Sequence, residues 1–85
     1  MMTDVEQKVL VLKTKYEDDV DSILRAKNDE DILFAVADLE DLYYQIQRFL
    51  NDRGFKIPEE MRKELIALAN KIKRLLEKYK PAELE

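Results

Sequence analysis

Apolar residues recur with the period of an α-helix along almost the whole of this 85-residue chain, and the pattern breaks at only two places. One break, at 26–29, reads Ala-Lys-Asn-Asp, and the other, at 53–58, contains the chain's one glycine and a proline. Apolar spacings of three and four residues are typical of amphipathic helices, and glycine and proline mark helix ends. The sequence therefore predicts helices over about 3–27, 29–53 and 58–80, with a short tail at 81–85.

Residues that cap helices stand at the start of the first two predicted helices. Thr3 and Glu6 have the spacing of a capping box, in which the Thr hydroxyl and the Glu carboxylate bond to free backbone N–H groups. Asn28 is the cap candidate for the second helix, and the acids at 29–31 follow it where the helix dipole favours negative charge. Local chemistry thus indicates where both helices begin.

The break at 53–58 contains residues that end one helix and begin another. Gly54 predicts a Schellman motif, with Gly54 in the left-handed conformation and Phe55 reaching back onto Leu50. Pro58 suits the first position of the third helix, because its missing N–H is one that a helix start leaves unbonded in any case. We expect the short tail at 81–85 to add little packing.

Each predicted helix carries an apolar stripe, and the stripe of the second helix is the widest. Its members alternate at spacings of four and three and have further apolar residues beside them: Ile32, Val36, Leu39, Tyr43, Ile46 and Leu50, widened by Ala35, Leu42 and Phe49. So wide a stripe is expected of a helix that touches two neighbours. Because the connections are short, consecutive helices should be antiparallel. The predicted fold is all-α, a single domain in which three helices form an antiparallel, up-down-up bundle.

The length of the chain bears on assembly. A domain of 85 residues buries a smaller share of its surface than a larger domain does, so its core leaves a modest margin of stability. We therefore expect the bundle to be completed by oligomerisation, in the simplest case as a homo-oligomer. Charged residues make up 40% of the chain, a proportion typical of thermophilic proteins and equally of highly soluble helical ones.

The composition removes the commonest parts of a catalytic site. The chain has no histidine and no cysteine, and therefore lacks the usual metal ligands, the usual general base and a thiol nucleophile. We expect no enzyme activity, no cofactor, no metal and no small-molecule substrate. The first residues do not resemble a signal peptide, and no run of about 18 apolar residues occurs, which predicts a cytoplasmic protein without a membrane segment.

Acidic residues recur in groups on the first two predicted helices, as Glu17-Asp18 with Asp21 and as Asp38 with Asp41. This spacing resembles the paired acidic motifs of all-α nucleoside-triphosphate pyrophosphohydrolases of the MazG kind, with Asp at several positions where that family has Glu. The resemblance implies a magnesium-dependent pyrophosphohydrolase as a second alternative function. On a helical wheel, however, the four aspartates project away from the apolar stripes, whereas that family's sites face inward. A solvated acidic face is the preferred interpretation.

A further acid, Asp19, lies near the edge of the first helix's apolar stripe, where a regular heptad would place an apolar residue. We expect its carboxylate to sit at the flank of the bundle and to pair with a lysine or with water. An acid that is buried between helices can also fix their register, so Asp19 is at most a marker of specific packing.

Charge is unevenly divided between the second and third predicted helices. Segment 28–53 has seven acids and two bases, a net of −5, whereas segment 58–80 has seven bases and four acids, a net of +3. We interpret these charges first as complementary within the bundle, because an antiparallel pair places the acidic start of one helix beside the basic end of the other. The alternative function is a nucleic-acid accessory that uses Arg62, Lys73 and Lys80. The formal net charge of −4 argues against it.

The second helix has more apolar residues than one buried stripe requires. Leu33, Ala37 and Tyr44 form a lateral ridge roughly 100° around the helix from the stripe, and Phe34 points almost opposite the stripe. Aromatic residues with polar tips, such as Tyr44, suit protein interfaces. The predicted function is thus non-catalytic protein–protein association, either self-assembly or the docking of a partner's amphipathic helix, through Leu33, Phe34, Ala37 and Tyr44.

Overall fold

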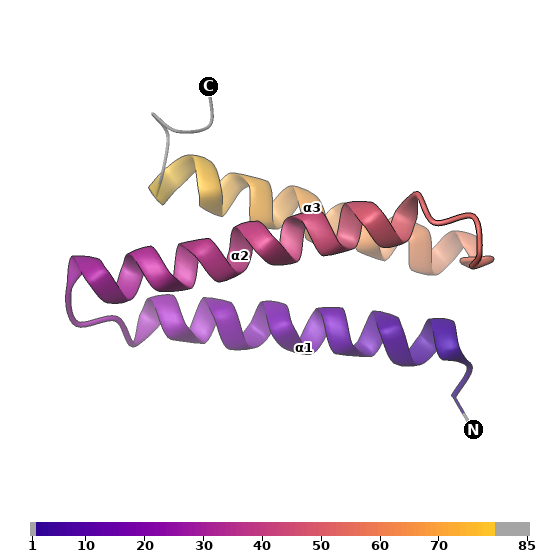
Figure 1. The fold of residues 1–85 in the computed structure, drawn as a ribbon, viewed down its shortest axis with the longest axis horizontal. Helices are drawn as coiled ribbons and strands as arrows, with labels where there is room; N and C mark the ends of the chain where they lie inside the picture. Colours follow the sequence, from indigo (N-terminus) through magenta and orange to yellow (C-terminus); the bar gives the residue numbers. More distant parts are fainter. Residues whose placement is uncertain (1, 80–85) are drawn as a thin grey trace.

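The computed structural model describes residues 2–79, which form three helices: α1 (Asp4–Leu24), α2 (Asp29–Leu50) and α3 (Glu59–Tyr79). The helices run up, down and up, so that α1 and α3 point in the same direction and α2 in the opposite one (Figure 1). This arrangement confirms the predicted all-α bundle of three helices. Lys80 and the tail at 81–85 lie outside the described residues.

The starts of α1 and α2 are built as predicted. The Glu6 N–H donates to the Thr3 hydroxyl at 3.1 Å, and the Thr3 N–H donates to the Glu6 carboxylate at 3.2 Å, which completes the capping box. The Asn28 side chain accepts from the Asp31 N–H at 2.9 Å. Because Asn28 needs an extended backbone to cap α2, α1 has to end before it. It ends at Leu24 rather than at the predicted 27.

The end of α2 differs from the prediction. The helix ends at Leu50 rather than at 53, and Asn51 follows as its C-cap. The predicted Schellman motif is wrong, because Gly54 does not adopt a positive φ. In a Schellman motif the Gly54 N–H would donate to a carbonyl oxygen of α2. Here it donates instead to the Asp52 carboxylate at 2.8 Å. Phe55 contacts the Phe49 ring, with centroids 5.2 Å apart, in an edge-to-face contact.

The core lies where the stripes of the three helices meet, and α2 supplies the largest part of it. Leu39 and Ile46 of α2 are fully buried, as are Leu12 of α1 and Leu65 and Ile72 of α3. The residues widening the α2 stripe are also buried, which confirms that one broad side of this helix touches two neighbours. Within residues 2–79, no helix is both long and apolar enough to cross a membrane.

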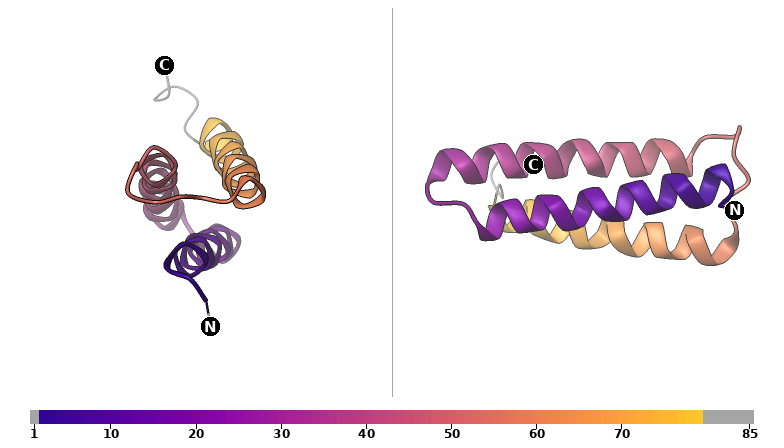
Figure 2. Two further views of the ribbon diagram at one scale, coloured as in Figure 1. Left: turned by 90° about the vertical axis from the view of Figure 1, so that its right-hand side faces the viewer. Right: turned by 90° about the horizontal axis from the view of Figure 1, so that it is seen from below.

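The outer helices meet each other less closely than either meets α2. Seen end on, the three helices occupy the corners of a triangle (Figure 2). Helix α3 is inclined to the other two, and its C-terminal end lies away from α1 (Figure 1). The packing of α1 against α3 is therefore the incomplete side of the bundle.

Replacing Leu39 by Ala tests the central place of α2 in the core. Leu39 is 0% exposed, so the change should leave a cavity and lower the free energy of unfolding by about 2–5 kcal/mol. Urea denaturation of the variant and the parent measures the difference. Leu33→Ala, on the outer side of the same helix, is the matched control and should cost less than about 0.5 kcal/mol. Equal losses at the two positions would contradict the three-helix packing.

Candidate interaction surfaces

The four residues predicted to form an interface all project outward from α2. Leu33, Phe34 and Tyr44 are 59%, 64% and 59% exposed, and Ala37 is also exposed. Leu33, Ala37 and Tyr44 lie along one line, because spacings of four and seven residues are close to whole helical turns. We call these three residues the α2 ridge. The bundle leaves the ridge bare.

The ridge points more directly outward than the sequence indicated. The buried side of α2 extends to Ala35, Leu42 and Phe49, which shifts its centre away from the ridge. The α2 ridge, which the main stripe alone placed at the side of the helix, therefore lies on the side of α2 that faces away from the core. No residue of α1 or α3 shields it enough to bury it.

Both aromatic residues of this surface have defined surroundings. The Tyr44 ring makes an edge-to-face contact with Tyr43, with centroids 5.8 Å apart and planes at 75°. Phe34 borders a shallow depression of about 310 Å³ at the α1–α2 turn, beside Ser22 and Ala26. Aromatic rings in such settings offer a large contact area with few rotatable bonds, which suits them to anchor an interface.

Carboxylates border the α2 ridge. Helix α2 has six acids and one base, a net of −5 over residues 29–50. Glu30 precedes Leu33 by three residues and Asp41 follows Ala37 by four, so each acid neighbours the ridge on the helix surface. Glu40 falls on the ridge line itself, three residues after Ala37 and four before Tyr44, so the outer face of α2 is an apolar line interrupted by one acid and flanked by others.

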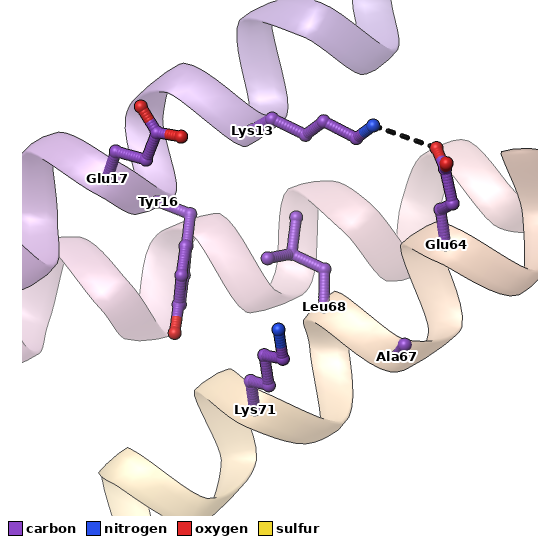
Figure 3. A pocket seen from close by; sticks show the side chains of 7 residues that line it. All are labelled: Lys13, Tyr16, Glu17, Glu64, Ala67, Leu68 and Lys71. Atoms are coloured by element: carbon purple, nitrogen blue, oxygen red, sulfur yellow. Dashed lines mark hydrogen bonds and ion pairs between the residues drawn. The ribbon is translucent and has the colours of Figure 1, made fainter.

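A groove lies between α1 and α3, on the incomplete side of the bundle. Its volume is about 350 Å³, and seven residues line it: Lys13, Tyr16, Glu17, Glu64, Ala67, Leu68 and Lys71. The Lys13 ammonium crosses the groove to the Glu64 carboxylate at 2.8 Å, and the side chains of Tyr16 and Lys71 extend into the space between the helices (Figure 3). The groove is therefore apolar at its centre and charged at its rim.

The groove was not predicted from the sequence, because Tyr16 and Leu68 continue the apolar spacing of their helices and that spacing indicates burial. Leu68 is buried, but Tyr16 is only partly covered. The signal that the sequence does offer is Ala67, whose short side chain beside Leu68 leaves space opposite α1. How much space remains depends on the angle between two helices that are not adjacent in sequence.

The basic residues of α3 are not neutralised within the bundle. Lys71, Lys73 and Arg74 are exposed and have no ion-pair or hydrogen-bond partner among residues 2–79. No ion pair of the described chain joins them to the acids at 29–31. Among the described residues, no direct contact therefore supports the interpretation that the bases of α3 pair with the acids of α2 inside the monomer.

The three bases proposed for nucleic-acid binding do not form one available patch in the described structure. Arg62 is partly buried and donates to the Leu50 carbonyl oxygen at 3.2 Å, so its guanidinium caps the end of α2. Lys73 is exposed, and Lys80 lies outside the described residues. Arg62 is thus engaged in holding α3 against α2.

The aspartates that resemble a magnesium-binding pattern are exposed, as the helical wheel predicted. Asp21 pairs with Arg25 at 3.0 Å, and Asp41 accepts a hydrogen bond from the Gln45 amide at 2.7 Å, whereas Asp18 and Asp38 face solvent. Among residues 2–79, no group of three or more carboxylates is arranged to hold a metal ion. In the described fold, the aspartates that have this spacing do not come together as ligands for one metal ion.

Asp19 lies on the side of α1 that faces α2, in a recess that Asp38 and Asp41 also line. Burial, together with the nearby charges of Asp38, Asp18 and Asp41, raises the pKa of Asp19 from 3.8 to about 6, against the opposing effect of Lys15. The Lys15 ammonium donates to the Gln45 side chain at 3.1 Å, so the expected pairing of Asp19 with a lysine is not made. The α1–α2 contact therefore carries an unfavourable charge at neutral pH.

Comparisons of the chain with protein families, curated proteins and solved structures find no significant match.

Asp19→Asn should make the fold more stable at neutral pH. Because the pKa of Asp19 is raised in the folded state, the folded protein binds this proton more tightly than the unfolded chain does. The stability that this bound proton contributes to the fold is fully present below pH 3.8, and it is lost as the pH rises to about 6 and beyond. We expect a Tm higher by a few degrees for the variant at neutral pH, with the difference shrinking toward about pH 4.

Glu77→Gln is the control, because Glu77 is an exposed acid on α3, away from this recess. Thermal unfolding of both variants and the parent over the same pH series separates the local effect from a general change in net charge. The same gain for both variants at every pH would contradict the role given to Asp19.

Proposed function

We propose that this protein works by binding protein through the outer face of α2, either a second copy of itself or an amphipathic helix of a partner, and performs no chemistry of its own. The observation that carries the proposal is the exposure of Leu33, Phe34 and Tyr44, each more than half exposed on one helix. Single exposed apolar residues are ordinary, but several large ones on the outer face of one helix, bordered by charge, favour an interaction site.

The cost of leaving this face in water supports the proposal. Hydration of apolar surface is unfavourable by roughly 25 cal/mol per Å², so covering the ridge and Phe34 in a complex is a source of binding free energy. The acids beside the ridge keep the isolated chain soluble and restrict which partners fit. A cytoplasmic location remains a prediction from the sequence.

Ala37→Glu tests the proposal at the centre of the ridge. A Glu there would bring an uncompensated charge into an apolar contact, which should weaken association at least about a hundredfold. The exposed position should leave the fold intact. Sedimentation from about 10 µM to about 1 mM, beside thermal unfolding, measures both properties.

Gln7→Glu is the matched control, since it adds the same charge at an exposed position on α1, outside both the ridge and the groove. We expect it to leave association unchanged. A parent that stays monomeric at about 1 mM would exclude self-association and leave a partner's helix as the ligand of this face. Equal effects of the two substitutions would reject the α2 ridge as the binding surface.

A further inference from the structure

We propose that the α2 ridge of one copy of this chain docks into the groove between α1 and α3 of a second copy. This inference rests on the proposed function and names the partner of the same face. It makes the contact heterologous, because two different surfaces of the chain meet.

Charge is the first reason for this pairing. The outer face of α2 belongs to a helix with a net charge of −5, whereas residues 70–79 of α3 have four bases and one acid, a net of +3. Lys71 stands at the rim of the groove without a partner among the described residues. The groove lining itself is balanced, with two lysines and two glutamates, so the positive charge that complements the acids of α2 comes from Lys71 and from the bases that follow it on α3.

Shape is the second reason. The groove is apolar at its centre, where Tyr16, Ala67 and Leu68 line it, and its volume of about 350 Å³ exceeds that of a tyrosine side chain. Tyr44 is the large residue of the ridge and can enter the groove as an anchor, with its hydroxyl near the polar rim. A helix laid between α1 and α3 also supplies the fourth helix that would complete a bundle on this side.

The direction of the docked helix follows from the same charges. An α2 helix that is antiparallel to α1 and α3, with Tyr44 beside Ala67 and Leu68, brings Asp41 level with Lys71 and Asp38 level with Arg74 of α3. The helix dipoles favour this direction as well, because the positive start of one helix meets the negative end of the other.

A symmetric contact between two α2 ridges is the less favourable alternative. It would bring together two helices that each have six acids and one base. Like charges placed across an interface oppose association. Contact between two grooves would instead leave both ridges in water. The heterologous contact covers an apolar surface on each copy. The acids of α2 meet like charge in the groove lining at Glu17 on the α1 wall and at Glu64, which is paired with Lys13.

Because every copy has one ridge and one groove, assembly does not have to stop at a dimer. Heterologous contacts form rings when the rotation between copies closes, and open chains when it does not. The parent should therefore form species larger than a dimer as its concentration rises.

The decisive experiment combines a variant of each surface. Ala37→Glu disables the ridge and keeps the groove, whereas Lys71→Glu disables the groove and keeps the ridge. Each variant alone should be at least about tenfold weaker in self-association than the parent. An equimolar mixture has one intact ridge and one intact groove for each pair of chains. By sedimentation it should give a 1:1 dimer that grows no further.

Two further variants sharpen the test. Lys63→Glu makes the same charge change at an exposed position of α3 outside the groove and should leave association unchanged. Glu17→Lys removes the opposing acid from the groove wall and should strengthen association at least about threefold. Thermal unfolding confirms that each variant is folded.

The outcomes separate this inference from the proposed function. If Ala37→Glu abolishes assembly while Lys71→Glu and Glu17→Lys leave it as in the parent, the ridge binds a second copy but the groove is not its partner. A mixture that remains monomeric would likewise overturn the heterologous contact. A parent that is monomeric throughout, or unaffected by Ala37→Glu, would reject self-association through the ridge itself.

Discussion

Burial of one broad side of α2 against both α1 and α3 is the interaction on which the rest of the structure depends. Leu39 and Ile46 are completely buried at its centre, and Ala35, Leu42 and Phe49 extend the buried surface to one side. Because this helix contacts both neighbours, α1 and α3 are each held mainly by α2 and only weakly by each other. The bundle is therefore a central helix with two partners rather than three equal pairs.

That unequal packing leaves two apolar surfaces exposed, the groove between α1 and α3 and the α2 ridge. Where α1 and α3 diverge, the ion pair of Lys13 with Glu64 spans the gap, but its side chains are 43% and 53% exposed. An exposed pair of this kind contributes only about 0–1 kcal/mol and does not draw the helices together. On the opposite side of the bundle, α2 has no neighbour at all. An apolar groove and an apolar ridge thus arise from the same packing. The groove lining is balanced in charge, and the excess of bases lies beside it on α3.

The charges also show that stability alone does not account for this sequence. Asp19 lies in the α1–α2 contact beside other carboxylates, and the nearby Lys15 only partly offsets its burial because the two side chains form no ion pair. Lys71 and Arg74 have no ion-pair partner among residues 2–79, although acids are plentiful on α2. Pairing such exposed bases would add little to folding, but the separation of the charges onto distinct faces is what the proposed association uses.

Taken by itself, the sequence determined the number of helices, the capped starts of the first two and the buried side of the second, because periodicity and caps such as Thr3 and Asn28 act over three or four residues. It placed the α2 ridge on the surface but misjudged its direction, and it predicted a left-handed Gly54 where the Asp52 carboxylate bonds the N–H instead. Only the tertiary structure decided that α1 and α3 diverge beside Ala67 and leave a groove. The angle between two helices depends on how side chains from all three fill the common space, and no local pattern in the chain specifies it.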